Sequence, residues 1–168
     1  MDAPGGQTSR RDRWLVALIA VVTALLIAYN LAMYYGPSFL LKGKEVVALT
    51  LFDAGSGVEE RIAVPAGTVL LHFWATWCSS CIAELPLLQE YAGRVTVIGV
   101  LKAPVRADHL RDLAVPWRNY RGPDGAFDDF MVTGVPVTVL LRDRAVAAVQ
   151  VGPLSREVLD RWLAASQR

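Results

Sequence analysis

The chain is poor in cysteine, in clustered basic charge and in repeated sequence, and each shortage excludes a class of protein. Cys78 and Cys81 are its only cysteines, whereas a small disulfide-stapled fold needs several pairs. A structural zinc site needs four ligands, and the only histidines that could join the cysteines are His72 and His109. Lys and Arg number 17 against 16 Asp and Glu, without a basic stripe, so nucleic-acid binding is disfavoured. The cysteine pair therefore predicts thiol chemistry, and we expect no metal site.

One long hydrophobic run lies near the N-terminus. No charged residue occurs between Trp14 and Tyr35, and as a helix this run would span roughly 33 Å, enough to cross a bilayer core of about 30 Å. Arginines within residues 10–13 precede it, so the positive-inside rule predicts a cytoplasmic N-terminus and a catalytic domain on the far side. A cleaved secretory or twin-arginine signal is the alternative, although residues 30–32 make a poor cleavage site.

These features divide the chain into four expected parts. They are a cytoplasmic tail at residues 1–13, a transmembrane anchor at 14–35, a tether at 36–44 and a folded domain at 45–168. Within the domain, apolar runs and turn residues predict the element order β-β-β-α-β-α-β-α-β-β-α, an α/β fold. The expected strands are 46–52, 58–64, 69–75, 95–101, 117–120, 136–141 and 145–151, and the expected helices are 79–91, 107–113, 126–131 and a last one capped by Ser155.

The two cysteines lie where an apolar strand gives way to a helix. Cys78 is expected at the N-terminus of the helix at 79–91, where unpaired N–H groups and the helix dipole stabilise a thiolate. We therefore predict that Cys78 is the nucleophile. Cys81, one turn further on, can attack a mixed disulfide between Cys78 and a partner, so we predict that it is the resolving thiol.

Two motifs together resemble those of a known family. The first is Phe-Trp-Ala-Thr-Trp-Cys, ending at Cys78, and the second is Gly-Val-Pro-Val-Thr at residues 134–138. Over residues 45–168 the chain resembles the thioredoxin superfamily, and more narrowly the membrane-anchored TlpA-like and ResA-like thiol-disulfide oxidoreductases. The narrower resemblance also rests on Glu84, Pro86 and the N-terminal anchor. It implies a thioredoxin-like α/β sandwich with a short N-terminal β-hairpin, preceded by one transmembrane helix.

The resemblance also implies how clients bind. It implies that the Val135-Pro136 peptide is cis, packs opposite the disulfide and pairs with an extended client segment. Without the resemblance, a trans proline at the edge of a strand would be the commoner reading. Trp77 is expected to shield the disulfide and to offer clients an apolar contact.

Two ionisable residues near the cysteines are expected to modulate them. Glu84 lies one helical turn after Cys81, and a carboxylate there would disfavour a thiolate; the alternative is a solvated helix charge. His72 occupies the place of a buried aspartate in thioredoxins and often of asparagine in the anchored relatives. It could accept the proton of Cys81, or it could be a core histidine without a catalytic effect.

The function that these residues imply is that of an enzyme, a thiol-disulfide oxidoreductase. We expect a single-pass protein of the bacterial inner membrane that reduces disulfides in periplasmic proteins, with cytochrome c maturation as one setting. It would use no cofactor beyond the Cys78–Cys81 disulfide, and a thiol-delivering membrane partner would reduce it again. The alternatives are a copper-binding assembly chaperone on the same fold, which usually has a wider cysteine spacing and a distant histidine, and an oxidase or isomerase.

Overall fold

The computed structural model describes residues 10–164. They fall into two compact units, divided between Gly36 and Pro37. Helix α1 (Arg10–Leu40) includes a segment, Asp12–Leu40, that is long and apolar enough to cross a membrane. The helix therefore begins within the expected tail and continues into the expected tether. Residues 1–9 of the expected tail lie outside the described part of the chain.

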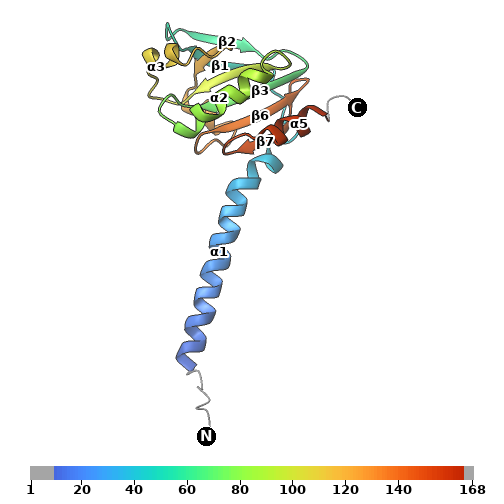
Figure 1. The fold of residues 1–168 in the computed structure, drawn as a ribbon. Helices are drawn as coiled ribbons and strands as arrows, with labels where there is room; N and C mark the ends of the chain where they lie inside the picture. Colours follow the sequence, from blue (N-terminus) through green and yellow to red (C-terminus); the bar gives the residue numbers. More distant parts are fainter. Residues whose placement is uncertain (1–9, 165–168) are drawn as a thin grey trace. The chain divides into compact units, whose positions relative to one another are not determined.

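The second unit is built on a seven-stranded sheet with the strand order β2-β1-β5-β4-β3-β6-β7 (Figure 1). The central strand β3 is parallel to β4 and antiparallel to β6. The hairpins β1–β2 and β6–β7 form opposite ends of the sheet. The strands are β1 (Ala48–Asp53), β2 (Glu59–Ala63), β3 (Thr68–Trp74), β4 (Thr96–Leu101), β5 (Asn119–Arg121), β6 (Val137–Arg142) and β7 (Ala145–Val151).

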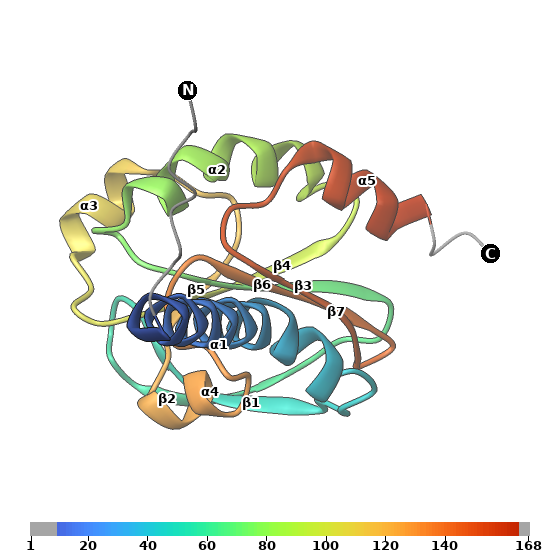
Figure 2. The same ribbon diagram turned by 90° about the horizontal axis from the view of Figure 1, so that it is seen from below.

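Helices cover both faces of this sheet. Figure 2 shows α2 (Ser79–Tyr91) and α5 (Arg156–Ala164) on one face and α4 (Asp124–Asp128) on the other. The short helix α3 (Ala107–Asp112) contributes Leu110 to the core beneath α2. The element order and the sandwich architecture confirm the predicted fold.

Strand β3 separates two hydrophobic cores because its side chains alternate between the faces of the sheet. Leu71 and Phe73 belong to the core on the α4 side, whereas Leu70 and Trp74 belong to the core beneath α2 and α5. By the same alternation, His72 points toward α2. A single histidine thus enters an otherwise apolar stretch of the strand.

Several predicted bounds differ from those observed by one to three residues, and two of these differences have a clear structural cause. The helix expected at 126–131 begins already at Asp124, after Pro123 as its N-cap, and ends at Asp128. A Cβ at Gly122 would lie 2.7 Å from Phe127 and from Val100, so this glycine permits close packing of α4 against β4. Proline fixes a φ suited to a helix start, which explains the earlier beginning.

The first predicted strand also begins too early. The Val46 N–H donates to the Arg144 carbonyl across 2.7 Å, and Glu45 forms a bridge with Ala145. Residues 45 and 46 therefore pair with the turn of the β6–β7 hairpin, and β1 starts only at Ala48. The apolar character of residues 46–52 predicts a strand, but it does not show which of these residues pair within the sheet as β1 and which pair with the β6–β7 turn.

Candidate active site

The two cysteines form a disulfide at the head of α2. Cys78 is the N-cap residue, and the backbone N–H of Cys81 donates to Cys78 Sγ across 3.2 Å. Cys78 retains 8% exposure, whereas Cys81 is fully buried. An incoming disulfide therefore reaches Cys78 first, and the free N–H groups at the helix start favour a negative charge on its sulfur. Ser80, one of the two residues between the cysteines, places its Oγ 3.3 Å from Cys78 Sγ.

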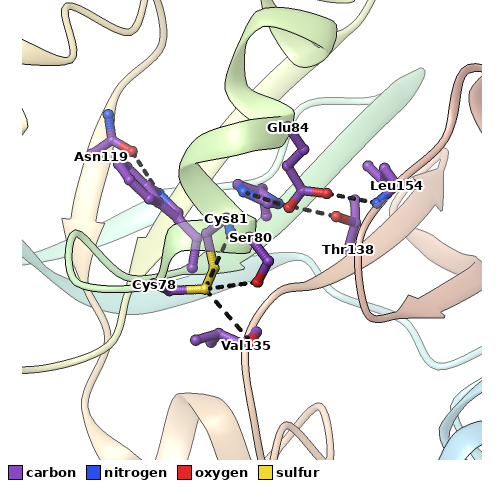
Figure 3. A network of polar contacts seen from close by, with 10 residues as sticks. Cys78, Ser80, Cys81, Glu84, Asn119, Val135, Thr138 and Leu154 are labelled. Carbon is purple, nitrogen blue, oxygen red and sulfur yellow. Dashed lines mark hydrogen bonds and ion pairs between the residues drawn. A yellow bond between two sulfur atoms is a disulfide. The ribbon is translucent and has the colours of Figure 1, made fainter.

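The loop before β6 lies against the disulfide. The Val135-Pro136 peptide is cis, as predicted, and the Val135 carbonyl oxygen lies 3.8 Å from Cys78 Sγ (Figure 3). Trp77, directly before the nucleophile, is 52% exposed. An exposed indole and a backbone segment beside the sulfur together form a surface on which an extended peptide could lie.

A polar cluster lies within the core beneath α2. His72 and Thr138 are fully buried and Glu84 is 5% exposed. His72 Nδ1 lies 3.0 Å from Thr138 Oγ1, and His72 Nε2 lies 3.6 Å from Glu84 Oε1. Glu84 Oε2 accepts the backbone N–H of Leu154 across 2.6 Å (Figure 3). The structure therefore excludes the solvated alternative for Glu84.

Three elements bring this cluster together. His72 on β3 is in register with Thr138 on β6, so both side chains leave the sheet on the same face. Glu84 lies on the buried face of α2 that also carries Cys81, one helical turn before it. Leu154, ahead of α5, closes the cluster from the remaining side. The sequence did not point to Thr138 or Leu154 because their contacts span 66 and 70 residues.

Burial determines the electrostatics of the cluster. It raises the pKa of Glu84 to about 7, against the opposing effect of the Leu154 N–H, which favours the carboxylate. Burial also lowers the pKa of His72 to about 3. Both changes favour the uncharged form, so at neutral pH the imidazole is neutral and the Glu84 carboxyl holds its proton about half of the time.

A second buried side chain with a polar atom extends from β3 into the core beneath α2. Trp74 is fully buried, and its indole N–H donates to Asn119 Oδ1 across 3.1 Å.

Between residues 10 and 164 no group of three or more His, Cys, Asp or Glu side chains is placed to hold a metal ion. The chemistry that the arrangement can perform is thiol-disulfide exchange.

Comparison with known proteins identifies the family. No family model matches the chain. The chain is 30% identical to a thioredoxin of Rhodospirillum rubrum, over 64% of this chain and 90% of that protein. It is also 30% identical to the thiol:disulfide interchange protein DsbE of Pasteurella multocida, over 71% of each chain. The chain belongs to the thioredoxin family.

Two further matches of this thioredoxin-family protein support the same family and fold. It is 26% identical to the thioredoxin-like protein YneN of Bacillus subtilis, over 90% of this chain and 96% of that one. A solved thiol:disulfide interchange protein from Chlorobium tepidum superimposes with a TM-score of 0.63 at 17% identity, covering 76% of this chain and 98% of that one, which supports the fold. With a disulfide at the head of α2 and thiol:disulfide interchange proteins among its relatives, the protein is a thiol-disulfide oxidoreductase.

Proposed function

We propose that the protein is tethered to the bacterial inner membrane and reduces disulfides in extracytoplasmic proteins. The observation that carries this proposal is the Cys78–Cys81 disulfide at the N-terminus of α2, with the more exposed sulfur beside the Val135 carbonyl. The apolar helix within Asp12–Leu40 supports the tether. The DsbE relatives support a role in thiol-disulfide interchange.

The reaction proceeds through one covalent intermediate. In the reduced enzyme the Cys78 thiolate attacks one sulfur of the client disulfide, which forms a mixed disulfide and releases the other client sulfur as a thiolate. Cys81 Sγ then attacks Cys78 Sγ, forming the intramolecular disulfide and releasing the second client thiolate. Two electrons pass from the enzyme dithiol to the client, so no further cofactor is needed.

Client binding uses the surface around the nucleophile. An extended client segment would pair with the backbone at Val135 and lie over Pro136, while the exposed indole of Trp77 would cover its apolar side chains. Backbone pairing is tolerant of sequence, which suits an enzyme with several clients. Apocytochrome c, whose haem-attachment motif is Cys-x-x-Cys-His, is the client class that we propose.

The oxidised enzyme must be reduced again in order to turn over. A thiol-delivering membrane partner would attack the Cys78–Cys81 disulfide and return both cysteines to thiols. The arginines that precede the apolar helix favour a cytoplasmic N-terminus, which would place the domain at residues 37–168 in the periplasm.

Measurement of the reduction potential tests the direction of electron flow. The full chain in detergent micelles would be equilibrated with defined thiol and disulfide mixtures, and the fraction of oxidised protein would be measured. A reductase requires a value near that of thioredoxin, about −270 mV. A value near about −120 mV, typical of a strong oxidant, would reject the reductase assignment in favour of an oxidase.

A peptide carrying an oxidised Cys-x-x-Cys-His motif tests the proposed client. The reduced full chain should reduce this peptide faster than a matched peptide in which the histidine and its flanking residues are scrambled. Equal rates for the two peptides would remove the connection with cytochrome c while leaving the general reductase intact.

A further inference from the structure

A polar side chain lies within the apolar part of α1. Asn30 is five residues before Tyr35, which places it about 8 Å inside the end of the charge-free run at 1.5 Å per residue. One N–H of its Nδ2 donates to the Leu26 carbonyl across 2.8 Å. Between residues 10 and 164, its Oδ1 and its second N–H have no hydrogen-bond partner. In a bilayer core, which holds no water, a polar group on another helix satisfies such atoms best.

Asn30 belongs to a seven-residue repeat along α1. Residues of one set recur every seven positions, and a residue of a second set follows each of them by three, as the a and d positions of a coiled coil do. The a residues are Val16, Thr23 and Asn30, and the d residues are Ile19, Leu26 and Met33. β-Branched residues at a and a single asparagine at a favour two parallel helices in one register. We call these six residues the Asn30 seam.

The Asn30 seam is uncovered in a single chain. All six of its residues are exposed. A hollow on this face is lined in part by Thr23, Leu26, Ile27 and Asn30, which occupy successive a, d, e and a positions. In a coiled coil, each a or d side chain enters a hole formed by four residues of the facing helix. The d residue Leu26 of a second parallel helix would therefore fill this hollow.

A second copy of this chain meets these requirements. We propose that two copies pair in parallel through the Asn30 seam, with their Asn30 amides hydrogen-bonded to each other. An amide both donates and accepts, so it is its own complement across a two-fold axis. All copies insert in the same direction and bring Asn30 to the same depth, whereas a helix of another protein would have to supply a polar group there. The inference rests on the proposed membrane tether, and each pair carries two redox-active disulfides.

A different face of α1 is the competing surface for pairing. Small residues recur there every four positions, a pattern that favours close right-handed crossings of membrane helices. They are Ala20, Ala24, Ala28 and Ala32. This face lacks an amide, so pairing through it would leave the Asn30 side chain in lipid. The free amide therefore favours the Asn30 seam over the alanine face.

Cysteine cross-linking in membranes tests which face pairs. In a full chain that carries Cys78→Ser and Cys81→Ser, Leu26→Cys places a thiol in the Asn30 seam, and Leu25→Cys places one beside it. A mild oxidant added to isolated membranes should join the Leu26→Cys chain into a product of twice its mass and leave the Leu25→Cys chain monomeric. Equal yields at both positions, or a product that contains a different protein, would overturn the inference.

Energy transfer between fluorescently labelled full chains in micelles measures the strength of pairing. Asn30→Leu should weaken dimerisation about tenfold, as loss of a hydrogen bond between membrane helices does. Leu26→Ala should also weaken it. Leu25→Ala removes a leucine that is 65% exposed, compared with 58% for Leu26, and should have no effect. Ala28→Leu fills the alanine face and should have no effect either.

Two outcomes separate this inference from the proposed function. If alkaline carbonate releases the wild-type chain from membranes, the proposed tether fails and the inference fails with it. If the chain stays in the membrane but is monomeric, or if Asn30→Leu and Leu26→Ala both dimerise as the wild type does, only the inference is overturned. Every dimerisation variant keeps Cys78 and Cys81, so normal reduction of a peptide disulfide shows that its domain is folded.

Discussion

The buried carboxyl of Glu84 makes the stability of the protein depend on pH. Burial raises its pKa from an ordinary 4.5 to about 7, so between these values the folded state holds a proton that the unfolded state releases. The contribution to the free energy of unfolding is therefore fully present below about pH 4.5 and is lost as the pH rises to about 7. At about 1.4 kcal/mol for each tenfold change in an equilibrium constant, the loss amounts to about 3 kcal/mol.

Comparison with Glu84→Gln isolates this contribution. Urea unfolding of the full chain in micelles, followed by tryptophan fluorescence, gives the free energy of unfolding of both proteins at about pH 4 and about pH 8. The lowered pKa of His72 acts in the opposite direction, but its cause is burial of the ring. Glu84→Gln is isosteric and keeps this burial, so the effect of His72 cancels in the difference. The wild-type protein should lose about 3 kcal/mol relative to Glu84→Gln between the two pH values. A difference that does not change with pH would refute the reasoning, and Glu90→Gln, which alters an exposed glutamate on the same helix, should show no such dependence.

Three further predictions follow from packing, exposure and topology. Leu88→Ala removes a fully buried side chain beneath α2 and should lower the free energy of unfolding by about 2–5 kcal/mol in the same urea assay; a loss below about 1 kcal/mol would contradict the packing described. Trp77→Ala should change stability by less than about 0.5 kcal/mol but slow the reduction of peptide disulfides, and equal rates would remove its role in client contact. Protease added outside spheroplasts should digest residues 37–168, and complete protection would contradict the proposed topology.

The strand and helix order follows from local signals. Apolar runs bounded by glycine, proline and aspartate mark the strands, and the cysteine before the helix at 79–91 marks its start, which the structure confirms at Ser79. Ser155 caps the last helix as predicted, its Oγ accepting the N–H of Val158. These features depend on neighbours in the sequence, so the sequence alone was sufficient to find them.

The polar cluster depends on contacts that no local pattern records. The sequence identified His72 and Glu84 as unusual residues near the cysteines, but it left open whether either was buried with a partner. Their meeting depends on the register of β3 with β6 and on the path of the chain before α5. Thr138 appeared only as the last residue of a motif, because a threonine in a strand gives no sign of a histidine 66 residues away.

Covalent capture tests the central claim, that Cys78 attacks and Cys81 resolves. Cys81→Ser in the full chain should accumulate mixed disulfides with extracytoplasmic proteins, visible as reducible adducts on gels after acid quenching of cells. Cys78→Ser, the matched control, retains only the fully buried sulfur and should give none. Adducts of equal abundance in both variants, or adducts in neither, would contradict the account.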